Sequence, residues 1–324
     1  MPLADKLHKN LRRIFLGPTD LPQACDLALH CPQTEVGVWL HGMGEPQDVT
    51  ARHSVACAAP FMFCIGFENK QDLEKHRKSR LYLRFCERQN RGKLLGEIGL
   101  RAGTVFSAEG LQLCLFQTTS CTNFCLPRPR LWAHYLNHVY KQWKDRKTDE
   151  VHPSLLDGRC NTVTFICPRP VVLVSVLDGH YGSIFPMNLM GTVGRNYFAF
   201  ALNSKKQAAH LVAQLGQLTV SNIPFDRSAV ARSLGKNHYQ QSIDWEKLPF
   251  RTQRSRILQI PVPEFALRVR ELKVESALPL GSHTFFVARI LGEEVLCHSP
   301  EFCMIHGLYE ARRRSIRLSA VSPS

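Results

Sequence analysis

The feature that most constrains the fold is the run VVLVSVL at residues 171–177, in which apolar and mostly β-branched side chains follow one another almost without interruption. Such a run is typical of a β-strand that is buried on both faces. Asp178 and Gly179 follow it as a turn, and residues 183–191 and 196–202 are expected to form a second and a third strand. We therefore expect a sheet at the start of the C-terminal half.

One helix interrupts these strands. In SKKQAAHLVAQLG (204–216) the apolar residues recur at helical spacing, Ser204 stands where an N-terminal cap belongs, and Gly216 stands where a C-terminal glycine belongs. Strand-like sequence returns in QLTVSN, in 265–274 and in HTFFVARI, and a change of phase near Arg270 and Glu271 predicts a bulge or corner. Strands on both sides of one helix favour an α+β fold with a mostly antiparallel barrel.

The N-terminal half shows the same mixture of elements without a motif that carries chemistry. Strands are expected at 36–40, 59–67, 80–86, 92–100 and 111–117, and helices at 70–78 and 131–143. No repeat of fixed period is found, and a polar stretch at 144–160 is the expected boundary. We divide the chain into an α+β domain of unknown role (1–150), the barrel domain (151–310) and a basic tail (311–324).

Composition limits the partners. The 324 residues include 41 Lys and Arg against 27 Asp and Glu, a formal net charge of +14, which favours anionic partners. No aromatic and basic signature accompanies this charge, so nucleic acid is not expected. The twelve cysteines lie within apolar strings, which indicates free thiols in a reducing cytoplasm, and the longest apolar run is too short to span a membrane.

Four segments in sequence order resemble the flavin reductase family of FMN-binding split β-barrels, over about residues 160–300. They are PRPVVLVSVLDG, GSIFPMNLMGTVG, NYFAFALNSKKQAAHLVAQLGQLTVSNIP and FALRVRELKVESALPLGSHTFFVARI. The resemblance implies an FMN cofactor, NAD(P)H as a co-substrate, transfer of a hydride from the nicotinamide to the flavin, and a homodimer. It also agrees with the absence of a Rossmann glycine motif, because in this family the nicotinamide stacks on the flavin.

The resemblance also implies the residues of a flavin site. A flat, largely apolar ring needs apolar contacts on its face and main-chain groups at its edge. The expected ring contacts are Phe185, Pro186, Met187, Asn188, Leu189 and Met190, with Gly191 permitting close approach. The expected phosphate site is Asn203, Ser204, Lys205 and Lys206, at the start of a helix. Asn222 is expected near the ribityl chain and His283 near the flavin, as a binding residue; no catalytic residue is assigned.

Two other classes of function remain open at this point. One is a flavin-binding protein without turnover, and the other is a basic adaptor protein that keeps the barrel without a cofactor. Cys121, Cys125, His134 and His138 form C-x3-C-x8-H-x3-H, which has the donor types of a zinc site. The inner gap is shorter than the roughly twelve residues of a zinc finger, and buried thiols with interfacial histidines explain the same residues. We expect no metal.

Overall fold

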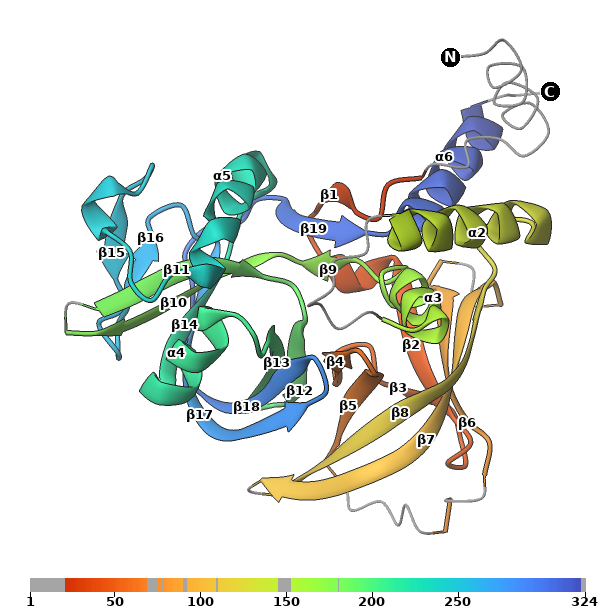
Figure 1. Ribbon diagram of the computed structural model, residues 1–324, viewed down its shortest axis with the longest axis horizontal. Helices are drawn as coiled ribbons and strands as arrows, with labels where there is room; N and C mark the ends of the chain where they lie inside the picture. The colour runs from red at the N-terminus through yellow and green to blue at the C-terminus, as the bar shows by residue number, and fades with distance from the viewer. Residues whose placement is uncertain are drawn as a thin grey trace.

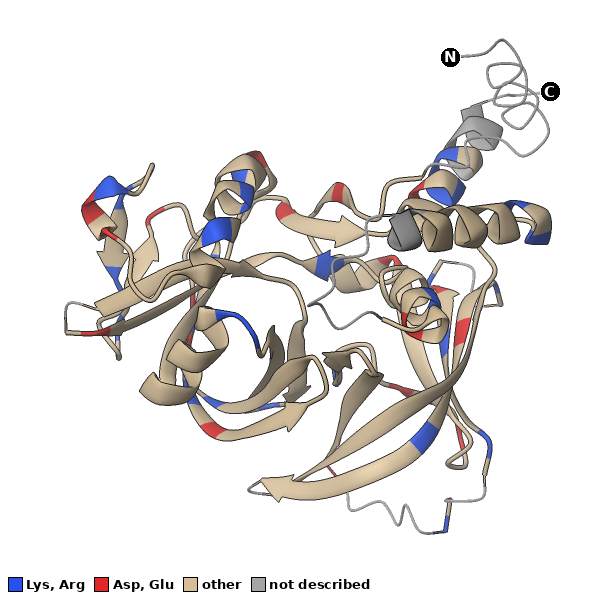
Figure 2. Cartoon of the chain, in the orientation of Figure 1, with Lys and Arg blue, Asp and Glu red and all other residues tan. Residues whose placement is uncertain are grey.

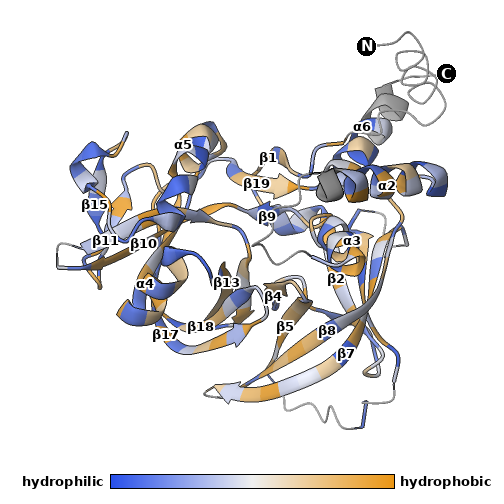
Figure 3. Cartoon of the chain, in the orientation of Figure 1, coloured by the Kyte–Doolittle hydropathy of each residue, from blue (hydrophilic) through white to orange (hydrophobic). Residues whose placement is uncertain are grey.

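The chain folds around two seven-stranded antiparallel sheets that lie side by side, one from each half of the sequence (Figure 1). The computed structural model describes residues 21–68, 75–76, 79–89, 92–108, 110–144, 153–179 and 181–321. The expected domain boundary at 150 and 151 lies outside these residues. Hydrophobic residues gather along the strands of both sheets (Figure 3), so the apolar segments found in the sequence are the framework of both halves.

The N-terminal sheet has the strand order β3-β2-β6-β7-β8-β5-β4. Its strands are β2 (Val36–His41), β3 (Gln47–Asp48), β4 (His53–Ala58), β5 (Phe61–Phe67), β6 (Leu81–Glu87), β7 (Leu94–Ala108) and β8 (Leu111–Asn123). All five strands expected in this half are present. The helix expected at 70–78 falls mainly outside the described residues, whereas the one expected at 131–143 lies within α2 (Arg128–Lys144).

The C-terminal sheet has the strand order β11-β10-β14-β17-β18-β13-β12. Its strands are β10 (Val172–Asp178), β11 (Tyr181–Met187), β12 (Met190–Gly194), β13 (Tyr197–Asn203), β14 (Gln217–Asn222), β17 (Arg268–Leu280) and β18 (His283–Val295). Helix α4 (Gln207–Leu215) joins β13 to β14 and ends at Gly216, whose φ of 66° is the left-handed conformation that glycine adopts freely. The bulge expected near Arg270 is confirmed by a register shift between Glu271 and Leu272.

Short elements complete this half. Between β14 and β17 lie the helical segments η2 (Phe225–Arg227), α5 (Ser228–Ser233), η3 (Leu234–Tyr239) and η4 (Trp245–Lys247), followed by the hairpin of β15 (Thr252–Arg254) and β16 (Pro261–Pro263). Segment η3 packs against β11 and α4. It therefore lies close to the segment that joins β13 to α4.

The two sheets repeat one topology. If the strands of each sheet are numbered in chain order, both sheets read 2-1-5-6-7-4-3 from edge to edge. The repeat extends to irregularities of register. The register of the β7–β8 pair shifts after Gly99 and after Ala102, and that of the β17–β18 pair shifts after Glu271 and after Val274. The two shifts have the same separation along the strand in both pairs. Strands β8 and β18 also have the same length. The halves are two copies of one architecture.

The second hairpin of each sheet agrees with this alignment. The β4–β5 pair skips one residue between Val55 and Cys57, and the β12–β13 pair skips one residue between Thr192 and Gly194. Bulges are positional features of a sheet because each one leaves a residue unpaired and bends the strand. Their coincidence supports a residue-by-residue alignment of the two halves.

Each sheet has its own apolar core, and a third core lies between the sheets. Phe63 and Ile65 lie in the N-terminal core, and the aligned Phe198 and Phe200 lie in the C-terminal core. The residues of β5, β8, β13 and β18 that point the other way form the third core, which includes Cys64 and Leu113 from one sheet and the aligned Ala199 and Phe285 from the other. Equivalent faces therefore meet, as in a two-fold symmetric dimer.

The contact between the sheets is unusually close at two glycines. A Cβ atom on Gly66 would lie 1.6 Å from the carbonyl oxygen of Val193, and a Cβ atom on Gly191 would lie 2.5 Å from the carbonyl oxygen of His53. Thr192 Oγ1 also donates a hydrogen bond to the Ala51 carbonyl at 2.8 Å. The glycines allow main chain to pack on main chain, so the relative position of the halves is tightly specified.

A small sheet and three helices tie the halves together. Strand β19 (Glu301–Ile305) pairs with β1 (Cys25–Leu29) on one side and with β9 (Arg169–Pro170) on the other. Helices α3 (Leu155–Thr164) and α6 (Gly307–Val321) contribute to the N-terminal core together with α2. The short η1 (Pro32–Thr34) lies beside β2. The segment expected as a basic tail begins within α6, where Arg312 pairs with Glu87 at 3.1 Å.

The expectation of mostly antiparallel sheet is confirmed, but the C-terminal sheet does not close into a barrel. Its edge strands, β11 and β12, are at opposite ends of the strand order and do not pair. Strand β12 instead packs against β4 and β5 of the N-terminal sheet. The other half of the chain therefore covers the edge strand that closure would have protected.

Candidate functional site

The expected ring-contact residues divide between the protein core and a cavity. The side chains of Phe185 and Met187 point into the C-terminal core and are buried. The ring of Phe185 lies 4.8 Å from the ring of His238, whose Nε2 atom donates a hydrogen bond to the Pro186 carbonyl at 2.8 Å. A ligand at this strand would contact its main chain rather than the side chains of Phe185 and Met187.

The turn from β11 to β12 carries the other expected ring contacts. Asn188 lies outside both strand ladders, and its amide nitrogen lies 3.7 Å from the sulfur atom of Met304. Leu189 packs at the junction of the two halves. Met190 and Gly191 line a cavity between the halves. At Gly191 the close approach that glycine permits is made by the His53 carbonyl.

Of the expected phosphate residues, Asn203 ends β13, and Ser204, Lys205 and Lys206 form the segment between β13 and α4, which is visibly basic (Figure 2). Asn203 Oδ1 accepts a hydrogen bond from the Lys205 amide at 3.0 Å. The N-cap of α4 is Lys206 and not Ser204; no side chain caps the helix, because the Ser204 hydroxyl lies 3.1 Å from the hydroxyl of Thr284 instead. The first amides of α4 are thus left without a side-chain acceptor.

Two histidines lie close to this basic segment. Burial, with the positive charge of Lys206, lowers the pKa of His238 to about 4 and that of His283 to about 4. His283 Nδ1 lies 2.8 Å from the Ser282 hydroxyl, and Lys206 Nζ lies 5.0 Å from the centre of the Tyr239 ring. Both histidines are therefore neutral at neutral pH, and the lysine is the charged member of this cluster.

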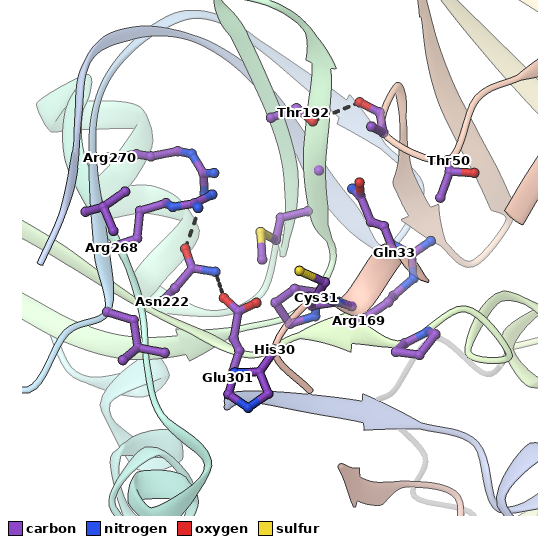
Figure 4. Close-up of a pocket in the computed structure, with 18 of the residues that line it drawn as sticks. His30, Cys31, Gln33, Thr50, Arg169, Thr192, Asn222, Arg268, Arg270 and Glu301 are labelled. Atoms are coloured by element: carbon purple, nitrogen blue, oxygen red, sulfur yellow. Dashed lines mark hydrogen bonds between the residues drawn. The ribbon is translucent and has the colours of Figure 1, made fainter. Parts of the chain in front are cut away.

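Asn222 lies apart from that cluster. It pairs with Arg268 at one end of β17, whereas His283 pairs with Leu280 at the other end. Its amide nitrogen donates to the carboxylate of Glu301, and its oxygen accepts from Arg270 Nη1 at 3.2 Å (Figure 4). The expected site residues therefore fall into two groups at opposite ends of the β17–β18 hairpin.

A cavity of about 480 Å³ lies between the halves and includes Met190, Gly191 and Asn222 from the expected set. The N-terminal half contributes residues 30–33, 50, 51 and the start of β4 to its wall. The C-terminal half contributes β9, β12, β13, the ends of β14 and β18, the start of β17 and the segment that leads into β19. Its charged and titratable lining residues are His30, His53, Arg169, Arg268, Arg270, His298 and Glu301. None of these was expected from the sequence, although two arginines alternate with Val269 in RVR, the spacing that puts both on one face of a strand.

The four candidate zinc ligands, Cys121, Cys125, His134 and His138, do not come together. Cys121 lies near Cys160, the Cys125 thiol lies 3.8 Å from the Leu95 carbonyl, and the ring of His134 lies 5.5 Å from that of His306. Within the part of the chain that the structure describes, no group of three or more His, Cys, Asp or Glu side chains is arranged to hold a metal. Among the same residues, no helix is both long and apolar enough to cross a membrane.

Comparison with known proteins supports the resemblance found in the sequence. Residues 165–307 match the family model described as flavin reductase like domain, so the resemblance is confirmed over these residues. No curated protein matches the chain.

Solved structures that resemble part of the chain include an FMN-binding protein of Thermus thermophilus (18% identity, 40% of this chain and 73% of that chain, TM-score 0.35). An NADH:FAD oxidoreductase of Streptomyces globisporus is 14% identical over 50% of this chain and 95% of its own, with a TM-score of 0.42. The flavin reductase component of a bacterial two-component tryptophan halogenase is 17% identical over 46% and 92%, with a TM-score of 0.41.

Proposed function

Because residues 165–307 match the flavin reductase like domain, we propose that this half binds FMN and that the protein is an NAD(P)H-dependent flavin oxidoreductase. The observation that carries the proposal is the extent of the match, which includes every residue expected at the flavin. A bound flavin supplies the redox chemistry by accepting a hydride from reduced nicotinamide. The chain has to bind the flavin, orient it and keep water away.

The segment before α4 fits the phosphate of FMN. Lys206 has no ion pair among the described residues, and the two histidines beside it are neutral, so its positive charge lacks a counter-ion. The uncapped amides at the start of α4 add N–H donors and the positive end of the helix dipole. Lys205 adds a second charge. A dianionic phosphate satisfies the donors and the charge together.

The main chain at the β11–β12 turn fits the edge of the ring. Asn188 is outside both ladders, so its peptide groups are available to a ligand, and Pro186 presents its side chain at a half-buried position. His238 and His283 hold hydrogen bonds as neutral groups and do not supply protons at neutral pH. These residues therefore bind and orient the flavin, and the cofactor carries the reaction.

We also propose that the N-terminal half takes the position that a second subunit has in a homodimer. The two sheets share one topology, and their equivalent faces pack together. A single chain then supplies both sides of the interface. Multi-angle light scattering tests this: a mass of one chain, with flavin binding retained, supports the proposal, and an obligate dimer contradicts it.

Titration of the purified protein with FMN, followed by flavin fluorescence, tests the binding proposal. We expect binding that is weakened at least about tenfold in Lys206→Ala, since charge-assisted hydrogen bonds contribute roughly 1.5–3 kcal/mol. Lys236→Ala removes the same charge from an exposed position nearby in η3 and serves as the control. Equal losses in the two variants, or no binding by the wild type, contradict the proposed site.

Oxidation of NADH and of NADPH in the presence of FMN tests turnover separately. Consumption of either nicotinamide that depends on both protein and flavin supports an oxidoreductase. Tight flavin binding without consumption contradicts the enzymatic part of the proposal and favours a flavin-binding protein without turnover.

A further inference from the structure

The cavity between the halves has a charge that the proposed flavin site does not use. Arg169 is only 5% exposed and lines the cavity (Figure 4). Its Nη2 atom lies 3.2 Å from His53 Nε2, its Nε atom is buried without a hydrogen bond, and no carboxylate pairs with it among the described residues. A buried cation without a counter-ion is strongly destabilising.

His53 does not compensate for that charge. Its Nδ1 atom donates to the Val49 carbonyl at 2.7 Å, which leaves Nε2 as the acceptor for Arg169. Burial and the neighbouring arginine lower the pKa of His53 to about 4, so the imidazole is neutral. The pair is a neutral acceptor beside a full positive charge, and no protein acceptor among the described residues takes the Nε donor of Arg169.

The opposite wall of the cavity is also basic. Arg268 and Arg270 share the carboxylate of Glu293, at 3.4 and 2.6 Å. Glu301 is the one carboxylate among the described residues that line the cavity, and it accepts a hydrogen bond from Asn222. Three guanidinium groups thus face two carboxylates, and the uncompensated charge is that of Arg169.

The N-terminal half provides an internal comparison for this polar wall. Alignment of the two long hairpins places Gly96 at the position of Arg268 and Ile98 at that of Arg270, while Phe85 pairs with Gly96 as Asn222 pairs with Arg268. Helix α3 fills the space there, because a Cβ atom on Gly96 would lie 2.5 Å from Val163. The fold itself therefore does not require arginines at this end of the sheet.

Apolar groups complete the cavity. Met190, Phe198, Leu267 and Val295 line it together with the charged residues. The guanidinium carbon of Arg270 lies 5.9 Å from the centre of the Phe198 ring, a cation–π distance that holds this arginine against the aromatic face. The combination of apolar walls and guanidinium groups is that of a small-molecule site for an anion with a hydrophobic body.

We propose that this cavity binds a small organic anion whose carboxylate or phosphate group pairs with Arg169 and whose apolar body lies against Phe198 and Leu267. The volume of about 480 Å³ is within the range of small-molecule sites. The anion supplies the counter-charge that the protein alone does not provide. The site is separate from the basic segment before α4, which lies at the other end of the β17–β18 hairpin.

The test uses benzoate, phenyl phosphate and the neutral benzamide as probes, with binding measured by calorimetry and by the shift of the thermal midpoint. We expect benzoate or phenyl phosphate to bind and to raise the midpoint, and benzamide to do neither. The carboxylate and phosphate probes distinguish a free organic acid from a phosphorylated ligand. Arg169→Gln should weaken binding at least about tenfold, and exposed Arg101→Gln should leave it unchanged.

Two further measurements separate a binding role from a structural one. Without a probe, Arg169→Gln should melt no lower than the wild type, because it removes a buried charge that lacks a counter-ion. FMN titration of the same variant should be unchanged, which separates this site from the flavin site. If Arg169→Gln does not fold, Arg270→Gln provides the test of binding. Failure of every anion to bind at millimolar concentration overturns the proposal. So does equal binding by the wild type, Arg169→Gln and Arg270→Gln.

Discussion

Replacing Gly66 with alanine tests the packing of the two sheets. Gly66 lies on β5, where its amide donates to the Arg52 carbonyl at 3.0 Å, and β12 of the other half crosses it. The added Cβ would lie 1.6 Å from the carbonyl oxygen and 2.7 Å from the carbonyl carbon of Val193. Neither group belongs to a side chain that could rotate away.

The cost follows from the distance. The main chains have to separate by at least about 1.4 Å before the contact reaches 3.0 Å, and the apolar core between the sheets opens with them. Insertion of a methyl group into a packed interior costs roughly 1–3 kcal/mol. Because two main chains are involved here, we expect about 3 kcal/mol, which corresponds to a fall of about 4 °C in the thermal midpoint of a chain of 324 residues.

Urea denaturation followed by tryptophan fluorescence measures the effect. Gly235→Ala is the control, because a Cβ atom there meets nothing within 4 Å. We expect that control to change the free energy of unfolding by less than about 0.5 kcal/mol. If Gly66→Ala unfolds at the same urea concentration as Gly235→Ala, the close contact between the halves does not exist as described.

Two further predictions concern the cores and pH. Phe286→Ala should cost about 3–5 kcal/mol in urea denaturation, because the Phe286 ring is buried and stacks on Phe200 at 5.0 Å, whereas exposed Tyr181→Ala should cost little. Buried His53 has a pKa of about 4 against an ordinary value of 6.5, so the unfolded chain binds more protons in this range. The free energy of unfolding should therefore fall by up to about 3 kcal/mol through this histidine as the pH falls from 6.5 to 4. His53→Gln should flatten that part of the plot of unfolding free energy against pH. Parallel plots for the wild type and the variant would contradict the assignment.

Most strands of both halves follow from the sequence, because each is a compact apolar run ended by turn residues. The register shift near Glu271 was also predicted, although its extra residue, Leu291, lies in β18 and not in β17. The repeat of topology was not. Aligned positions carry unlike residues, such as Ile98 and Arg270, and the inserted segments between β14 and β17 remove any fixed period.

The candidate sites were only partly accessible to sequence reasoning. The basic segment before α4 is local, so its position at a helix start could be inferred, although the cap at Ser204 was wrong because that hydroxyl turns to Thr284. Phe185 was expected to face a ligand, but period-two alternation does not say which face is the core. Arg169 and His53 come together only through packing between the halves.

The most direct test of the central claim compares FMN with riboflavin, which has the same ring and no phosphate. If the segment from Ser204 to Lys206 holds the phosphate, FMN should bind the wild type at least about tenfold more tightly than riboflavin. This preference should shrink in Lys206→Ala, because one charged donor is lost while Lys205 and the amides of α4 remain. Equal affinities for the two ligands in the wild type, or an undiminished preference in Lys206→Ala, would contradict the account.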